Sequence, residues 1–296
     1  MILNYFQSNN FGDALNPYIF NHFLPNFFDG DPEVSFVGIG SILGLSHVRK
    51  ANKKIVFSSG FAYGAIPSVD SSFDIFCVRG PLTCEALKIN KNLAVSDGAI
   101  LLQFMEKKED DKKYKFSFIP HWESMEKFNW ETICEMSDVH YIKPTDSIDS
   151  VLSQIKQSEV VIAEAMHGAI VADALRVPWI PVKAYKGINF FKWQDWASSL
   201  NLEYNPIQIK SLYNDTNFTR KVIRDKTGYP LPLGTLSPVV RMYEVYQSMF
   251  LVQGVVREFE KLKLVAPSLS NDTILNSKGN QLLTTLDKIK KKYSQD

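Results

Sequence analysis

EAMHGAIVADALRVP, residues 164–178, is the stretch that decides the fold of this chain. It lies between two apolar runs, 160–163 and 179–182, and therefore predicts a strand, a compact helix and a second buried strand, which form one βαβ unit. His167 and Gly168 fall where the first strand ends and the helix begins. In an open parallel sheet this junction lies on the ligand-binding edge, and the free N–H groups of the helix start attract an anion. The stretch predicts a functional site at His167.

Length, charge and cysteine content narrow the class of protein. The chain has 296 residues, of which 45% are hydrophobic, which suits two domains at about 150 residues each. Its 33 basic and 32 acidic residues nearly balance, which argues against a nucleic-acid partner bound by bulk charge. The three cysteines form no CxxC pair, which favours reduced thiols. Because the sequence shows no signal-like start and no run of about 18 apolar residues, we expect a cytoplasmic protein.

Strand-like runs alternate with loops and helix-like segments along the chain, which is the pattern of an α/β protein. Helices are expected from Asp13 as N-cap towards Phe23, at 147–156 and at 192–200. The expected strands are 2–6, 34–37, 54–57, 74–78, 93–95, 114–119, 139–143, 160–163, 179–182 and 206–210.

A charged run at 106–113 is the best linker candidate, although a solvated helix face would give the same pattern. It predicts an N-terminal Rossmann-like domain at 1–105 and a C-terminal one at 114–236, followed by a helical segment at 237–296. Two sets of apolar residues in that last segment are spaced as buried helix faces. They are Val239, Met242, Val245, Tyr246 and Met249, and then Leu282, Leu286 and Ile289.

Polar residues follow the expected strands in both halves, which predicts a cleft between the two domains. His167 is the strongest candidate because Gly168 keeps the backbone open beside it, and the alternative is a histidine that only caps a helix. Arg79 precedes Gly80 and Pro81 at a second strand-to-helix junction. That position suits anion binding as well as a surface ion pair with a carboxylate.

Three further side chains and one turn are weaker candidates. Lys186 follows an expected strand, where it can be a second cation of the site or an ordinary exposed lysine. Asp13 can cap a helix and can also present its carboxylate to a hydroxyl. His121 ends a strand beside a tryptophan, where a packed histidine is the alternative. The turn at 38–41 permits close backbone approach to a ligand, but it lacks the third glycine of the dinucleotide fingerprint and the lysine of a P-loop.

Other common chemistries lack their motifs in this sequence. There is no HExxH, no CxxC pair and no cluster of acidic and histidine residues at ligand spacing, so we expect no metal and no other cofactor. There is also no GxSxG elbow for acyl transfer.

Six segments, in this order, resemble polysaccharide pyruvyltransferases and are most similar to the succinoglycan pyruvyltransferase (ketalase) branch. The resemblance covers roughly residues 1–195, and the joint order of the six is far more specific than any one of them. The segments are 10–17 (NFGDALNP), 37–43 (VGIGSIL), 78–81 (VRGP), 96–99 (SDGA), 118–121 (FIPH) and 164–178.

The resemblance implies a GT-B-like α/β fold of two facing Rossmann-like domains. It also implies transfer of a pyruvyl group from phosphoenolpyruvate to two hydroxyls of one sugar, a hexose such as galactose in a polysaccharide repeat-unit precursor, to form a cyclic ketal. The family's catalytic histidine falls on His167, its donor-binding arginine on Arg79 and, with a one-residue change in spacing, its later lysine on Lys186. Many members carry an arginine two residues before the histidine, where this chain has Ala165.

The implied donor sets requirements that the residues can meet. Phosphoenolpyruvate carries a carboxylate and a phosphate, so its site needs cations or free N–H groups, which Arg79, Lys186 and the helix start at Met166 and Gly168 could supply. An imidazole can both deliver and remove protons near neutral pH, so His167 is expected to be the acid/base. The expected catalytic residues are His167, Arg79 and Asp13. The expected acceptor-binding residues are Asp13, Asn16, Gly40, Ser41 and His121.

Two other functions stay open at the level of sequence. A GT-B glycosyltransferase that uses a nucleotide sugar would share the fold, and an inactive carbohydrate-binding member of a polysaccharide assembly pathway would fit the departure at Ala165. The lysine-rich carboxyl end raises a further hypothesis, contact with the inner face of a membrane near a lipid-linked acceptor. We favour the simpler interpretation, in which these lysines complement the helix dipole in solvent.

Overall fold

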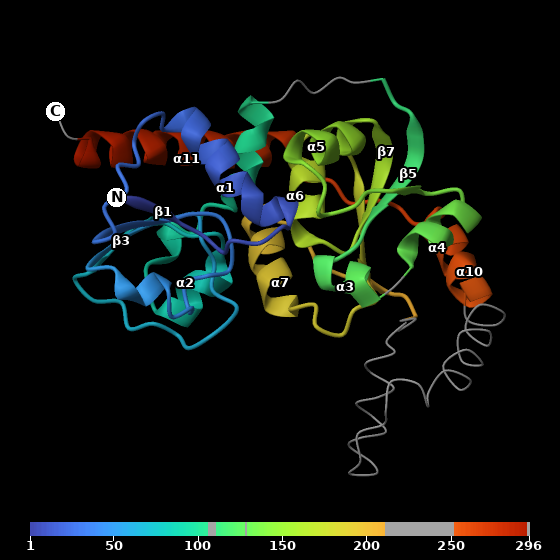
Figure 1. Ribbon diagram of the computed structural model, residues 1–296, viewed down its shortest axis with the longest axis horizontal. Helices are drawn as coiled ribbons and strands as arrows, with labels where there is room; N and C mark the ends of the chain where they lie inside the picture. The colour runs from blue at the N-terminus through green and yellow to red at the C-terminus, as the bar shows by residue number, and fades with distance from the viewer. Residues whose placement is uncertain (106–110, 128, 211–251, 295–296) are drawn as a thin grey trace, which may run out of the picture.

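The described residues of the computed structural model, 1–105, 111–127, 129–210 and 252–294, form two parallel β-sheets (Figure 1). The first has the strand order β1-β2-β3-β4 and the second β6-β5-β7-β8-β9. This confirms the predicted α/β class with parallel sheets. The strands are β1 (Ile2–Asn4), β2 (Val34–Val37), β3 (Lys53–Phe57), β4 (Phe73–Cys77), β5 (Tyr114–Ile119), β6 (His140–Tyr141), β7 (Ser158–Ala163), β8 (Trp179–Lys183) and β9 (Ile207–Gln208).

Helices connect and cover the strands of both sheets. The α-helices are α1 (Phe11–Phe23), α2 (Pro81–Leu87), α3 (Trp122–Lys127), α4 (Trp130–Met136), α5 (Ile148–Lys156), α6 (Met166–Ala174), α7 (Phe190–Ser199), α10 (Val252–Leu262) and α11 (Asp272–Tyr293). The 3₁₀ helices are η1 (Val48–Lys50), η2 (Lys91–Leu93) and η3 (Gly98–Phe104).

The predicted strand at 93–95 is wrong. Ala94 makes only an isolated parallel bridge to Val78. The backbone here is fixed by two capped turns instead, because Asn90 accepts a hydrogen bond from its own turn before η2 and Asp97 accepts one before η3. Side-chain caps of this kind compete with strand formation.

The start of α1 also differs from the prediction. Asn10, not Asp13, occupies the N-cap position, and Asp13 lies in the first turn. Pro17 lies inside the helix and has no N–H to donate to the carbonyl of Asp13 four residues earlier. The side-chain amide of Asn16 donates to that carbonyl at 3.0 Å and also pairs with both backbone groups of Ile39. Asn16 therefore repairs the helix and ties α1 to the segment after β2.

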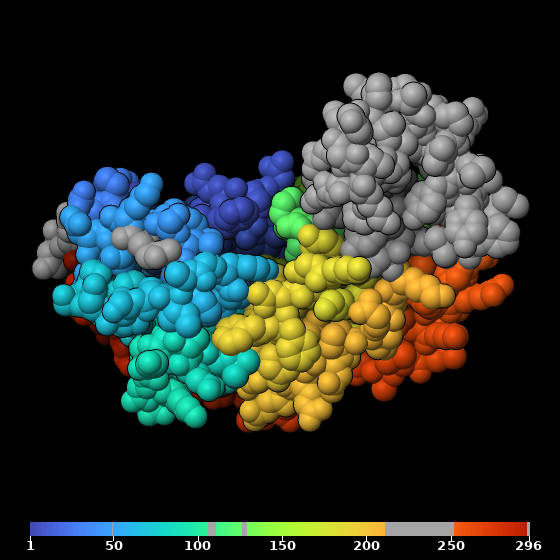
Figure 2. Space-filling view, turned by 90° about the horizontal axis from the view of Figure 1, so that it is seen from below, coloured from blue at the N-terminus to red at the C-terminus, as the bar shows by residue number. Residues whose placement is uncertain are grey.

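Helix α7 joins the two halves of the molecule, because its apolar face packs on its own sheet and its polar side chains contact the N-terminal half. Trp193 and Trp196 are fully buried, and both rings pack against Trp179 of β8. Lys192 and Asp195 contact the N-terminal half, through the Tyr63 ring and Arg79 respectively. Figure 2 shows the N-terminal half, in blue to cyan, in contact with the yellow segment that includes α7. The helix is thus held by its own sheet and presents polar groups to the other.

Helix α11 returns from the C-terminal half and extends along the N-terminal half (Figure 1). Leu282, Leu286 and Ile289 are buried, as the periodicity predicted. At its end, Lys292 Nζ and Tyr293 Oη both donate to the carboxylate of Asp74 in β4. One of the carboxyl-terminal lysines is therefore engaged with this protein's own sheet, and membrane contact by the others stays a prediction.

Several predictions concern residues outside the described part of the chain. They include the apolar set from Val239 to Met249, most of the charged run (106–110) and the end of the second predicted domain, so the domain boundaries stay predictions. Cys77, Cys84 and Cys134 are free, buried thiols. Among the described helices, none combines the length and the apolar character needed to cross a bilayer.

Candidate functional site

A cavity of about 300 Å³ lies between the two sheets, and both halves of the chain form its wall. All of its lining residues are in segments that follow the carboxyl end of a strand, as expected for a ligand site of parallel sheets. From the N-terminal half they are Phe6, Asn10, Asp13, Gly40, Ser41, Ile42, Leu45 and Tyr63. From the C-terminal half they are His121, Trp122, Glu123, Ala165, Met166, His167 and Lys192.

His167 lies in the first turn of α6 at the wall of this cavity, and its side chain is 11% exposed. Burial lowers the pKa of the imidazole below its usual value, and the nearby Asp97 and Asp13 carboxylates oppose that shift. The lowered pKa favours the neutral imidazole, which is the form that can accept a proton. Ala165 is the N-cap of α6 and makes no side-chain cap hydrogen bond to the first-turn N–H groups beside the cavity.

Two glycines allow the histidine to take this position. A Cβ at Gly12 in α1 would lie 2.3 Å from Nδ1 of His167, so α1 and the imidazole are in direct contact. A Cβ at Gly168 would lie 2.5 Å from Cγ2 of Ile119, the last residue of β5. Gly168 is thus required for close packing of α6 on the sheet. It does not line the cavity itself.

Asp97, which the sequence did not single out, lies opposite the histidine. Its Oδ1 is 3.8 Å from His167 Nε2, and its carboxylate is fully buried at the start of η3. The residue belongs to the N-terminal half, whereas His167 belongs to the C-terminal half. The only signal in the sequence was the segment 96–99, whose partner 70 residues later could not be identified locally.

The lysine in the cavity is Lys192 of α7 rather than Lys186. Lys186 is exposed in the turn after β8 and does not line the cavity. Lys192 is half-buried, and its Nζ lies 5.9 Å from the centre of the Tyr63 ring. Burial lowers its pKa to about 8, with a further contribution from the charge of Arg79. The missed signal was Asn189, whose side chain caps α7 and places Lys192 in its first turn.

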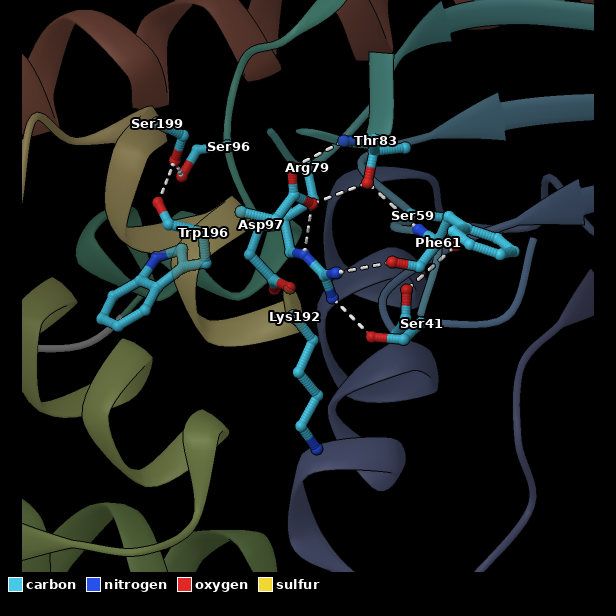
Figure 3. Close-up of polar contacts among 12 residues, drawn as sticks. Ser41, Ser59, Phe61, Arg79, Thr83, Ser96, Asp97, Lys192, Trp196 and Ser199 are labelled. Carbon is cyan, nitrogen blue, oxygen red and sulfur yellow. Dashed lines mark hydrogen bonds and ion pairs between the residues drawn. The ribbon is translucent and has the colours of Figure 1, made fainter. Parts of the chain in front are cut away.

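Arg79 is fully buried and does not line the cavity. Figure 3 shows its polar contacts. Its Nε donates to Asp195 of α7 at 3.0 Å, and its Nη1 donates to Ser41 Oγ at 2.6 Å. Asp195 also accepts from the backbone N–H and the hydroxyl of Thr83. The guanidinium therefore supplies positive charge near the site and positions Ser41, which does line the cavity. In Figure 3 the Lys192 side chain extends away from this network.

Glu164 organises the C-terminal side of the site. Its buried carboxylate accepts hydrogen bonds from the backbone N–H groups of His121, Ala184 and Tyr185. Burial raises the pKa of this carboxyl group, while those hydrogen bonds oppose the shift. The Tyr185 ring stacks on the His121 ring at 5.5 Å between centroids. One side chain at the end of β7 thus fixes the segments that follow β5 and β8.

The other predicted site residues are placed as follows. Asp13, Gly40, Ser41, His121 and Met166 line the cavity together with His167. Asn16 is fully buried and engaged by protein hydrogen bonds, so the structure gives it a structural role instead of acceptor contact. Asp13 accepts a hydrogen bond from Ser8 Oγ at 2.6 Å.

Among the described residues, no group of three or more histidine, cysteine or acidic side chains is arranged to hold a metal ion.

The structure is that of an α/β protein with a cavity at the carboxyl ends of two parallel sheets. The family model of polysaccharide pyruvyl transferase matches residues 10–185. The chain is also 33% identical over 307 aligned positions to the succinoglycan biosynthesis protein ExoV of Rhizobium meliloti (strain 1021), with 97% of each chain covered. No solved structure matches. The chain therefore belongs to the polysaccharide pyruvyl transferase family and is a transferase.

Proposed function

We propose that this protein transfers the pyruvyl group of phosphoenolpyruvate to two hydroxyls of a sugar, forming a cyclic ketal and releasing inorganic phosphate. The observation that carries the proposal is a cavity lined together by the His167 imidazole, the Lys192 side chain and the start of helix α6. Two parallel sheets on either side of this cavity suit a GT-B-like arrangement, with donor and acceptor between them.

The reaction balances with protons alone. One proton is added to the methylene carbon of phosphoenolpyruvate, which makes the adjacent carbon electrophilic. The two sugar hydroxyls form two C–O bonds to that carbon and lose two protons, while the bond to the phosphate breaks. One of these two protons balances the proton added to the methylene carbon, and the other is taken up by the released phosphate. A residue that can accept and return a proton at one position is sufficient, and His167 is that residue in our proposal.

The donor anion is held by charges on the C-terminal side. Lys192 and the first-turn N–H groups of α6 can bind a phosphate or carboxylate, as helix starts and lysines do elsewhere. Ala165 lines the cavity where many family members carry an arginine, and Lys192 is the lysine that lines the same cavity. Arg79 contributes by positioning Ser41 and by the electric field of its guanidinium charge. Lys186 is left out of the donor site because it lies outside the cavity.

The acceptor is a sugar held against the N-terminal side. Asp13 can accept a hydrogen bond from a sugar hydroxyl, and the backbone at Gly40 and the hydroxyl of Ser41 offer further polar groups. Tyr63 and Trp122 provide apolar surface for the face of a pyranose ring. A galactose unit of a polysaccharide precursor, free or attached to a lipid, is the acceptor that we propose to test first.

The test is incubation with phosphoenolpyruvate and a panel of galactosides, glucosides and mannosides, with phosphate release and the mass of the sugar as readouts. We expect His167→Gln to lower turnover by about 10²- to 10⁴-fold, because glutamine fills similar space but transfers no proton. Near-normal turnover of this variant would rule out the acid/base assignment. Release of a nucleoside diphosphate from a nucleotide sugar, without phosphate release, would favour a glycosyltransferase instead.

A further inference from the structure

Two buried polar atoms face each other across the two halves of the chain. Asp97 Oδ1 accepts a hydrogen bond from the backbone N–H of Ala99 at 3.0 Å and lies 3.8 Å from His167 Nε2. Within the described part of the chain, neither Asp97 Oδ2 nor His167 Nε2 has a hydrogen-bond partner. Buried polar atoms without partners are costly and uncommon in folded proteins. The Asp97 carboxylate is an acceptor and the His167 ring nitrogen a donor when protonated, so the two groups are chemically suited to each other.

A structural role for Asp97 does not account for its charge. The cap of η3 requires only one side-chain oxygen, and asparagine or serine would supply it equally well. The carboxylate is nevertheless fully buried, and η3 packs directly against α6. A negative charge kept in such a position is best explained by a positive charge that forms beside it, and the His167 imidazole is the group at that distance.

Charges of both signs act on the imidazole. Asp97 and Asp13 favour its protonated form, whereas Lys192 and Arg79 disfavour it. Of the two carboxylates, Asp97 exerts the larger effect. With Nε2–H directed at Asp97, the lone pair for proton transfer is on Nδ1, which lies against Gly12 of α1. A carboxylate of this kind fixes the tautomer of a catalytic histidine and stabilises the imidazolium that forms.

We propose that Asp97 is the positioning residue of His167, so that the N-terminal half supplies the carboxylate and the C-terminal half the imidazole of one catalytic pair. This inference rests on the proposed acid/base role of His167. It also implies that the pair depends on contact between the two halves, because each half supplies one member.

Asp97→Asn tests the proposal because it keeps the size and the η3 cap and removes only the charge. We expect kcat to fall about 10- to 100-fold with little change in KM for phosphoenolpyruvate. The acid limb of the kcat/KM profile should move to lower pH, because loss of the carboxylate lowers the pKa of His167 further. The same shift should appear without substrate, as a lower pKa in the NMR titration of the His167 ring, assigned by its loss in His167→Gln.

Asp173→Asn is the matched control. Asp173 is a buried aspartate on α6 itself, but its carboxylate is engaged by Trp179 and Ser270 away from the cavity. Its replacement should lower stability without moving the His167 titration. If Asp97→Asn does not fold, Asp97→Ser also keeps a cap and is expected to give the same shift. An unchanged His167 pKa with unchanged kcat would overturn the proposal. The substrate-free titration still decides the Asp97–His167 coupling if the proposed reaction itself proves wrong.

Discussion

Lys192 is the residue whose protonation should set the alkaline limit of donor binding. Burial lowers its pKa to about 8. It therefore carries its positive charge at neutral pH and loses it as pH rises through about 8. Above that pH an anionic donor no longer has the ammonium group of Lys192 to bind. We expect KM for phosphoenolpyruvate to rise above that pH in the native enzyme, while Lys192→Arg, which stays charged, should bind the donor with no such rise. Initial rates at several pH values measure this.

Lys186→Arg is the control for that series, since Lys186 is exposed and outside the cavity. Its pH profile should match that of the native enzyme. If Lys186→Arg loses the alkaline limit and Lys192→Arg keeps it, the lysine aligned by family resemblance is the donor cation after all.

At the residue scale, the sequence predicted His167, Asp13 and His121 at strand ends, and the structure brings them to one cavity. It could not predict which lysine reaches that cavity, because this depends on where the loop after β8 ends and α7 begins. It also could not show that Arg79 is paired with Asp195, which lies 116 residues later. Local patterns identify the edge of a sheet, whereas burial and pairing across halves depend on tertiary contacts.

At the scale of elements, the contact between α1 and α6 depends on Gly12. A methyl group there would lie 2.3 Å from His167 Nδ1, so the ring must rotate or α1 must move. We expect Gly12→Ala to lower kcat about tenfold or more, because sub-ångström positioning matters in catalysis, and to cost about 1–3 kcal/mol of stability through overpacking. Steady-state kinetics and urea unfolding measure the two effects separately.

Gly279→Ala provides the comparison at the same scale. A Cβ at Gly279 of α11 would approach Gln103 and Phe104 at 2.4 and 2.8 Å, a similar conflict between η3 and a helix but away from the lining of the cavity. It should cost a similar free energy of unfolding with kcat preserved. Equal kcat in the two variants would show that the Gly12 contact does not position His167.

Element prediction succeeded where apolar periodicity was strong and failed where side chains capped short turns. The strand at 114–119 and the helix that begins after Ser147 were predicted with nearly their observed bounds. At 93–95 the apolar run was too short to override the turn that Asn90 caps. In α1 the start was predicted from Asp13 as a capping residue, whereas the N-cap Asn10 makes no side-chain cap hydrogen bond.

At the scale of the whole molecule, the buried Arg79–Asp195 pair joins the N-terminal half to α7 and so to the second sheet. Both side chains are fully buried. Breaking such a pair leaves an uncompensated charge and typically costs about 3–5 kcal/mol. We therefore expect Asp195→Asn to lower the free energy of unfolding by roughly that amount, whereas Asp272→Asn should cost at most about 1 kcal/mol. Asp272 also binds an arginine, Arg176, but it is 74% exposed.

The double variant Arg79→Met/Asp195→Asn separates charge from packing in this joint. Removing both partners removes the unpaired guanidinium, so the double variant should be more stable than Asp195→Asn alone. Urea unfolding of the native protein, both single variants and the double variant gives the coupling free energy directly. Because the cavity lies between the two halves, the same loss should loosen the site, and donor affinity should fall in Asp195→Asn but not in Asp272→Asn. If Asp195→Asn is no less stable than Asp272→Asn, the pair does not hold the halves together, and the cavity must be maintained by the α7 and α11 contacts instead.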